Sequence, residues 1–170
     1  FDPAQKDLIN SLKNQISSMS NLGVVFHDRI DQKSLAKELL SSGVWLYSTW
    51  FSETSCITAM EMQAAGVEMV TSSIAALNET AGDRAILIDG DWATTEYQQK
   101  FIDAAVEKLT SSNDLHRKEL QNYAKNNFDL NLLAKDWQEM FFSLIEELKT
   151  NPIVPYQQKK KYLSNNKAEE

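Results

Sequence analysis

Cysteine is almost absent from this 170-residue sequence, which contains only Cys56. A single cysteine cannot form an internal disulfide, so nothing requires an oxidising compartment, and we expect a cytoplasmic protein. Long hydrophobic runs are also missing, because no apolar stretch approaches the ~20 residues of a membrane span. The opening "FDPAQKDLIN" lacks the pattern of a signal peptide and an initiator methionine, so we expect a fragment of a longer chain.

Positive charge is in deficit as well. The 17 Lys and Arg residues face 24 Asp and Glu residues, which gives a formal net charge of -7. Broad binding to nucleic acid or to an anionic membrane depends on an excess of Lys and Arg, so the sequence argues against both. Residues 159–161 are a run of lysines in a mostly polar stretch, which indicates a solvated tail. A weak contact with a membrane or a partner protein is the more specific alternative.

What the sequence does contain is enough hydrophobic residues, 42%, for the core of one domain. Apolar stretches alternate with stretches of helical period, which is typical of an α/β protein with a doubly wound parallel sheet. From these patterns we expect four strands, at residues 23–27, 44–48, 67–71 and 85–88. We expect helices at residues 2–19, 31–42, 55–66, 75–80, 93–109 and 130–148.

The helical segments have recognisable signals. The first has Asp2 as N-cap and Pro3 at its first position, and it places Leu8, Leu12, Ile16 and Met19 on one face. The apolar stripe of residues 93–109 consists of Tyr97, Phe101, Ala105 and Leu109, and that of residues 130–148 consists of Leu133, Trp137, Met140, Phe141, Leu144 and Leu148. Both stripes need a partner surface. Residues 1–150 therefore form the predicted domain, and residues 151–170 a tail or linker.

Ligands of an open parallel sheet bind outside the carboxyl ends of its strands, where helix N-termini favour anions. This rule selects the loops at residues 27–31, 48–55, 71–78 and 89–92. The helix after the second loop has Ser55 as its expected N-cap, with free backbone N–H groups on Cys56, Ile57 and Thr58. We expect this helix N-terminus to accept a diphosphate.

Two glutamates flank this helix N-terminus. Glu61 lies about 9 Å further along the helix than Ser55, a spacing that suits a nucleotide with its ribose hydroxyls at Glu61. Glu53 lies eight positions before it, in the loop. The same spacing separates Glu139 and Glu147, but that pair lies within one amphipathic helix without a preceding strand or loop, so we expect a solvated helix face there.

The stretch "YSTWFSETSCITAMEMQAAGVEMVTSSIAALNET", with its ordered strand, loop glutamate, helix glutamate, glycine and strand, resembles the nucleotide-sugar half of retaining GT-B glycosyltransferases, family 4 and its relatives. The resemblance covers about residues 22–145. It implies a Rossmann-like domain that binds a nucleotide diphosphate sugar, transfers the sugar to a hydroxyl acceptor, and needs neither metal nor cofactor. It also implies an acceptor-binding N-terminal domain in the same longer chain.

The resemblance assigns roles to particular residues. Glu53 would face the hydroxyls of the donor sugar as the catalytic-site glutamate, and Glu61 would hold the ribose. Backbone N–H groups of Thr54, Ser55, Cys56 and Ile57 would face the diphosphate, and Ile30 would border the base. The sequence departs from the family pattern where Ser48 replaces a proline and "TSC" a glycine-rich turn, and the basic residues that clamp the diphosphate belong to segments before the first strand seen here.

Other patterns offer alternatives. Asp89, Gly90 and Asp91 match the Asp-x-Asp with which metal-dependent GT-A transferases bind Mn²⁺ or Mg²⁺, although a capped turn is the simpler interpretation. His27 and Cys56 could be imagined as a nucleophile pair, but no third, orienting group is evident. We therefore interpret His27 as a strand-end residue and Cys56 as a packed or helix-start residue. A noncatalytic binding or interaction module with both glutamates on its surface is the alternative outside the enzymes.

Overall fold

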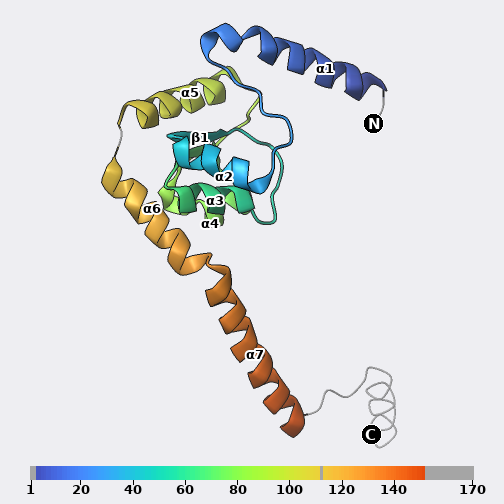
Figure 1. The fold of residues 1–170 in the computed structure, drawn as a ribbon, viewed down its shortest axis with the longest axis vertical. Helices are drawn as coiled ribbons and strands as arrows, with labels where there is room; N and C mark the ends of the chain where they lie inside the picture. The colour runs from blue at the N-terminus through green and yellow to red at the C-terminus, as the bar shows by residue number, and fades with distance from the viewer. Residues whose placement is uncertain (1–2, 112, 152–170) are drawn as a thin grey trace, which may run out of the picture. The chain divides into compact units, whose positions relative to one another are not determined.

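The structure is a computed structural model that describes residues 3–111 and 113–151. The chain divides into two compact units, residues 1–42 and residues 43–170 (Figure 1). The first unit contains helix α1 (Pro3–Ser18), the 3-10 helix η1 (Ser20–Leu22) and helix α2 (Gln32–Ser41). The second contains the sheet and the remaining helices, and the two units are described separately.

The two predicted helices of the first unit are confirmed. Helix α1 begins at Pro3, whereas its expected cap, Asp2, lies outside the described residues. Helix α2 begins after Asp31, whose carboxylate accepts hydrogen bonds from the backbone N–H groups of Lys33 and Ser34 at 3.0 Å. The hydroxyl of Ser34 adds a bond of 2.7 Å, and these contacts of Ser34 lower the pKa of Asp31.

The predicted strand at residues 23–27 is wrong. Residues 24–28 have no regular secondary structure, and the side chain of Val25 is 71% exposed. The described part of the first unit contains no second strand, so an extended segment there would leave its N–H and C=O groups without partners. β-branched and aromatic residues are typical of strands, but they do not form a strand without a neighbour.

The second unit contains a parallel sheet of three strands in the order β1-β2-β3. These are β1 (Val44–Tyr47), β2 (Glu68–Ser72) and β3 (Ile86–Ile88), which confirm the other three predicted strands within a residue or two. Val44 pairs with Glu68, and Val70 pairs with Ile86. The α/β class is thus confirmed, while the strand order of the described residues has no reversal of the kind that defines a doubly wound sheet.

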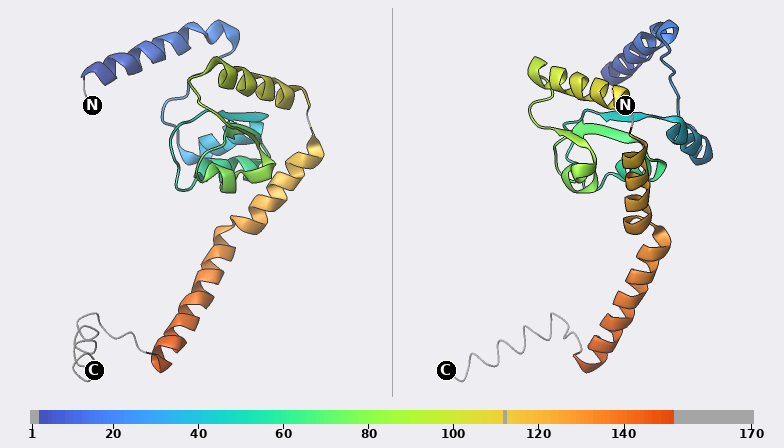
Figure 2. Two further views of the ribbon diagram at one scale, coloured as in Figure 1. Left: turned by 180° about the vertical axis from the view of Figure 1, so that it is seen from behind. Right: turned by 90° about the vertical axis from the view of Figure 1, so that its left-hand side faces the viewer.

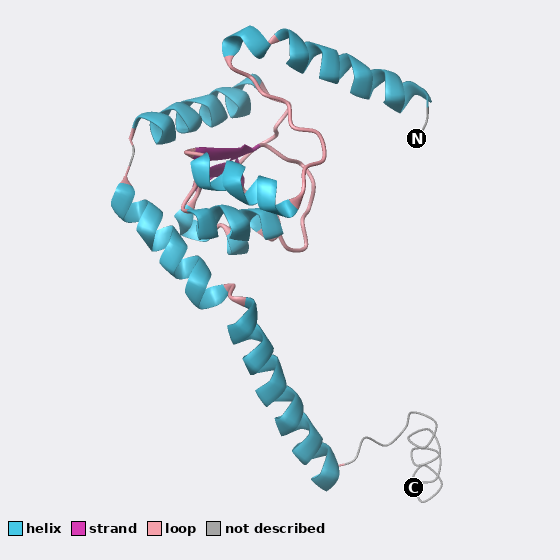
Figure 3. Ribbon diagram, in the orientation of Figure 1, coloured by secondary structure: helices cyan, strands magenta, loops and turns pink. Residues whose placement is uncertain are grey.

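Helices cover both faces of this sheet (Figures 1–3). Helix α5 (Thr95–Thr110) lies on one face, and helices α3 (Ile57–Ala65) and α4 (Leu77–Thr80) lie on the other, followed by the 3-10 helix η2 (Gly82–Arg84). Successive side chains of each strand point alternately toward the two helical layers. The core toward α5 contains Val70, Ile88, Tyr97 and Ala104, with Val44, Ile86 and Phe101 packed against it.

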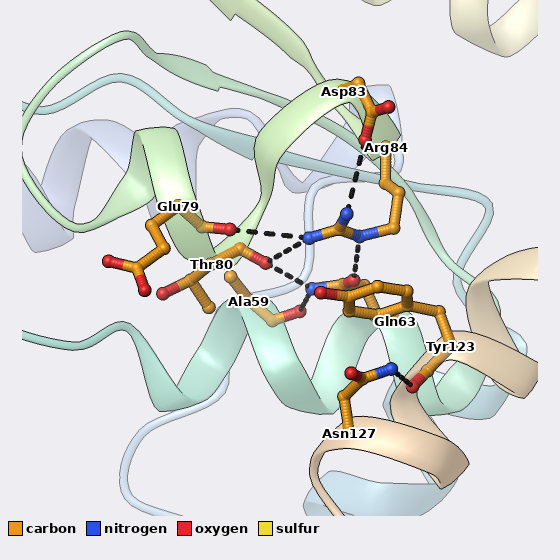
Figure 4. A network of polar contacts seen from close by, with 8 residues as sticks. All are labelled: Ala59, Gln63, Glu79, Thr80, Asp83, Arg84, Tyr123 and Asn127. Atoms are coloured by element: carbon orange, nitrogen blue, oxygen red, sulfur yellow. Dashed lines mark hydrogen bonds and ion pairs between the residues drawn. The ribbon is translucent and has the colours of Figure 1, made fainter.

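A buried polar network joins α3 to the α4–η2 segment (Figure 4). The amide of Gln63, which is completely buried, donates to the carbonyl groups of Ala59 and Thr80 at 3.0 and 2.9 Å. Its oxygen accepts from Arg84 Nε at 2.8 Å, and the guanidinium lies 3.6 Å from the ring centre of Tyr123. Because every polar atom of the Gln63 side chain is satisfied, the network fixes the inner face of α3.

Two further helices, α6 (Asp114–Asn127) and α7 (Leu130–Thr150), close the described chain. Helix α6 packs against α3, burying Leu120 and Ala124. Helix α7 matches the predicted helix, but the apolar stripe of residues 133–148 is 39–57% exposed and has no cover among the described residues. No helix in the described ranges combines the length and apolar character needed to cross a bilayer.

Candidate functional site

Glu53 lies in the loop that follows β1, at the carboxyl edge of the sheet. The hydroxyl of Tyr47, the last residue of β1, donates a hydrogen bond to Glu53 Oε1 at 2.9 Å. The main chain of Glu53 is held as well, because its carbonyl accepts from Ala76 N at 3.2 Å and its N–H donates to Phe51 O at 3.0 Å. Both the backbone and the carboxylate of the predicted catalytic-site residue are therefore fixed.

The start of this loop is anchored to β2. Ser72 Oγ, which is buried, accepts from Thr49 N at 2.8 Å and lies 2.7 Å from the hydroxyl of Tyr97 on α5. Thr71 Oγ1 donates to the carbonyl of Tyr47 at 2.8 Å. Side-chain hydroxyls of β2 thereby bind backbone groups at the point where the hydrogen bonds between β1 and β2 end. They fix the direction in which the loop leaves the sheet.

The next loop, after β2, contains a strained residue. Ala75 has φ 46°, a left-handed conformation that non-glycine residues seldom adopt. Its neighbour Ala76 is the residue whose N–H holds the carbonyl of Glu53. Strain of this kind concentrates at functional sites, where the surrounding structure enforces it. The backbone segment that binds the carbonyl of Glu53 is therefore held by the fold in an energetically unfavourable conformation.

Helix α3 begins at Ile57, so the prediction of Ser55 as its cap is wrong by one residue. Cys56 is the N-cap, and its side chain makes no capping hydrogen bond with the described residues. The buried thiol of Cys56 nevertheless faces the amides of Ala59 and Thr58. Thr54, Ser55, Ile57 and Thr58 are all exposed there. This arrangement leaves the N-terminus of α3 accessible to an anion.

The thiol of Cys56 is a packed group, as predicted. It is 5% exposed, and burial raises its pKa, with a further contribution from the charge of Glu53 and an opposing one from the amides of Ala59 and Thr58. A raised pKa disfavours the reactive thiolate. His27, the other half of the imagined nucleophile pair, belongs to the first unit, where it lies 3.8 Å from Glu38.

Glu61 lies one turn into α3, on the same side of the helix as Ile57 and Thr58. Ile57 and Thr58, three and four residues before it, are exposed, whereas Ala59 and Met62 point into the core. Glu61 is half-buried, and its carboxylate has neither a hydrogen bond nor an ion pair with any other described residue. A carboxylate of this kind keeps its full capacity to accept hydrogen bonds from a ligand.

A pocket of about 230 Å³ adjoins the start of α3. Thr54 and Ser55 line one side of it, and Tyr123 and Phe128 of the α6 segment line another. Its volume is below the ~300 Å³ at which ligand pockets usually begin, so the cavity is too small for a whole nucleotide sugar.

The predicted site residues fall into two groups. Glu53, Glu61 and residues 54–57 lie together in the second unit, within one continuous strand–loop–helix segment. Ile30 lies in the first unit, half-buried, immediately before the cap of α2. Its contact with the base stays a prediction.

The Asp89-Gly90-Asp91 segment forms a turn before α5. Asp91 Oδ1 accepts from Ala93 N at 3.0 Å, and the Asp91 carbonyl accepts from Thr94 N and Thr94 Oγ1 at 3.0 and 2.7 Å. Gly90 has φ 127°, a conformation that few other residues adopt. These contacts match the predicted capped turn. Throughout the described ranges, no cluster of three or more His, Cys, Asp or Glu side chains could hold a metal ion.

Sequence reasoning missed a buried charge cluster at the opposite edge of the sheet. Glu68, the first residue of β2, is 5% exposed; His116 Nδ1 lies 2.7 Å from its Oε1, and Lys108 Nζ lies 2.9 Å from its Oε2. Burial raises the pKa of Glu68, but Lys108 and His116 outweigh burial, so the pKa is lowered overall. The sequence feature that could have revealed this cluster is an acidic residue at the start of an otherwise apolar parallel strand.

Comparison with known proteins adds no relative: no protein-family model, no curated protein and no solved structure matches this chain.

Proposed function

We propose that this chain is the donor-binding domain of a retaining GT-B glycosyltransferase, which transfers a sugar from a nucleotide diphosphate sugar to a hydroxyl acceptor. One observation carries the proposal. A fixed glutamate, Glu53, lies at the carboxyl edge of a parallel sheet, directly before a helix with an uncapped N-terminus, and Glu61 follows one turn along with a free carboxylate. The order of these elements and the two glutamates are what the sequence shares with the family that it resembles.

Each part of the segment has a chemical role in this proposal. The first N–H groups of α3 and its dipole stabilise the diphosphate, both in the bound donor and as it becomes the leaving group. The carboxylate of Glu61 accepts hydrogen bonds from the two ribose hydroxyls, and that of Glu53 accepts from hydroxyls of the donor sugar. Residues 54–57 serve through their backbone, which tolerates the departures from the family's glycine-rich turn.

The proposal extends beyond the described residues. The doubly wound half of a GT-B fold needs further strands beside β1, and catalysis needs basic groups for the diphosphate and a second, acceptor-binding domain. We propose that these belong to the same longer, cytoplasmic protein, and that no metal or cofactor takes part.

Calorimetric titration of the chain with nucleoside diphosphates tests the proposal. We expect weak binding, and Glu61→Ala should weaken it by about 1.5–3 kcal/mol, the range for hydrogen bonds to a charged group. Glu139→Ala is the matched control, because Glu139 is an exposed helical glutamate outside the site and should leave the affinity unchanged. Thermal unfolding of each variant shows whether it is folded.

Two outcomes would contradict the proposal in different ways. If the folded wild-type chain binds no nucleoside diphosphate, a noncatalytic module is the better interpretation, with both glutamates as surface residues. If binding strictly requires Mn²⁺ or Mg²⁺ and is lost on changing Asp89 or Asp91, a metal-dependent GT-A-like transferase is the better one.

A further inference from the structure

Tyr47 is not among the residues that the family resemblance singles out, yet it donates the one side-chain hydrogen bond that Glu53 receives in the described chain. We infer that Tyr47 is a positioning residue, which holds the carboxylate of Glu53 so that its other oxygen accepts hydrogen bonds from the donor sugar. This inference rests on the proposed function.

The phenol of Tyr47 is itself rigidly held. Its ring stacks on Trp45 with 5.1 Å between ring centres and 22° between planes, and its carbonyl accepts from Thr71 Oγ1. The residue also belongs to β1, paired with Thr71 of β2. A hydroxyl fixed through both ring and main chain can restrain a partner, which a group on a mobile loop cannot do.

Glu53 needs such a restraint. Its main chain is held by Ala76 and Phe51, but a glutamate side chain retains three rotatable bonds, whose ordering on ligand binding costs free energy. The hydrogen bond from Tyr47 orders the carboxylate before a ligand arrives. It occupies one lone pair of Oε1, so Oε2 and the remaining lone pair of Oε1 are left as acceptors for sugar hydroxyls.

Tyr47→Phe tests the inference, because it removes the hydroxyl and keeps the ring. We would titrate the wild-type and variant chains with uridine, adenosine and guanosine diphosphate and with the corresponding diphosphate glucoses. For the nucleotide that the wild type binds, Tyr47→Phe should weaken binding of the nucleotide sugar about five- to tenfold, as for one lost hydrogen bond, and leave the free diphosphate within about twofold.

Tyr123→Phe is the matched control. Tyr123 is another half-buried tyrosine of the second unit, on α6, and its hydroxyl makes no hydrogen bond with any other described residue. A general loss of packing or stability would weaken both ligands in either variant and lower the unfolding temperature, whereas positioning of Glu53 predicts a sugar-specific loss in Tyr47→Phe alone. Adding Tyr47→Phe to Glu53→Ala should have no further effect on the sugar nucleotide, because the hydroxyl acts through that carboxylate.

The outcomes separate this inference from the function on which it rests. If the wild type binds both ligands and Tyr47→Phe binds the nucleotide sugar as the wild type does, the positioning role is refuted and the proposed function stands. The same follows if the effects of Tyr47→Phe and Glu53→Ala are additive. If the folded wild type binds neither the diphosphates nor their sugars, both proposals fail together.

Discussion

The buried carboxylate of Glu68 gives a quantitative prediction about stability. Glu68→Gln keeps the shape of the side chain but removes the charge that faces Lys108 and His116. Breaking a fully buried ion pair costs about 3–5 kcal/mol, but the side chains of Lys108 and His116 are 19% and 23% exposed and regain part of their hydration. We therefore expect Glu68→Gln to lower the free energy of unfolding by about 2 kcal/mol at pH 7.

The pH dependence of this loss follows from the lowered pKa of Glu68. A carboxyl group whose pKa is lower in the folded state stabilises the fold fully above its unfolded value, about 4.5, and this stabilisation disappears as the pH falls through the folded value. The difference between wild type and Glu68→Gln should thus shrink as the pH falls below about 4.5.

Urea unfolding at pH 7, 5.5, 4 and 3, followed by circular dichroism, measures this difference. Glu96→Gln is the matched control: Glu96 also has a pKa lowered by a lysine, Lys100, but the pair is exposed on α5, and water screens it. Its replacement should change stability little at any pH. A loss for Glu68→Gln that is as large at pH 3 as at pH 7 would refute the reasoning, as would no loss at pH 7.

Two further predictions concern the metal and the turn after α3. Because the proposed diphosphate site consists of backbone N–H groups, excess EDTA should leave the calorimetric affinity for nucleoside diphosphates unchanged, and a loss of binding would favour a metal site. Gly66→Ala should destabilise the chain by more than about 1 kcal/mol in thermal unfolding, since Gly66 has φ 70° and a Cβ there would meet Arg117 O at 3.1 Å. Gly43→Ala is the control and should be close to neutral, because Gly43 has open space around it and no left-handed backbone.

Sequence periodicity located the elements of the second unit well because local and tertiary preferences agree there. The residues that follow β1 and α3 are those that the two patterns require, either turn-forming residues or an apolar segment to pack against. Gly66, for example, ends α3 in the left-handed conformation typical of such a glycine. The boundary errors are small: α3 begins one residue after the position that Ser55 would cap. Such errors arise because several polar residues in a row, here Thr54 and Ser55, offer equivalent caps.

The failures have a different cause, since they involve partners that the pattern does not specify. Residues 23–27 have the composition of a strand, but strand formation depends on a neighbouring strand that the described first unit does not contain. The stripe on α7 predicted the helix correctly, yet the same stripe does not say what covers Trp137 and Phe141, which are about half exposed. Tyr47 and Glu68 escaped notice because their importance comes from contacts six and 48 residues away.

The two glutamate pairs show why context decides between equal spacings. Glu139 and Glu147 are eight positions apart, as are Glu53 and Glu61, but both members of the first pair are exposed on α7, where Glu139 lies 3.9 Å from Lys135. Such contacts on one helix face favour helix formation and solubility. Glu53, in contrast, is held from a strand and a second loop, and Glu61 is half-buried without a partner among the described residues. In the proposed function, hydroxyl groups of a bound nucleotide sugar would donate hydrogen bonds to both carboxylates, a role that the solvated pair on α7 does not offer.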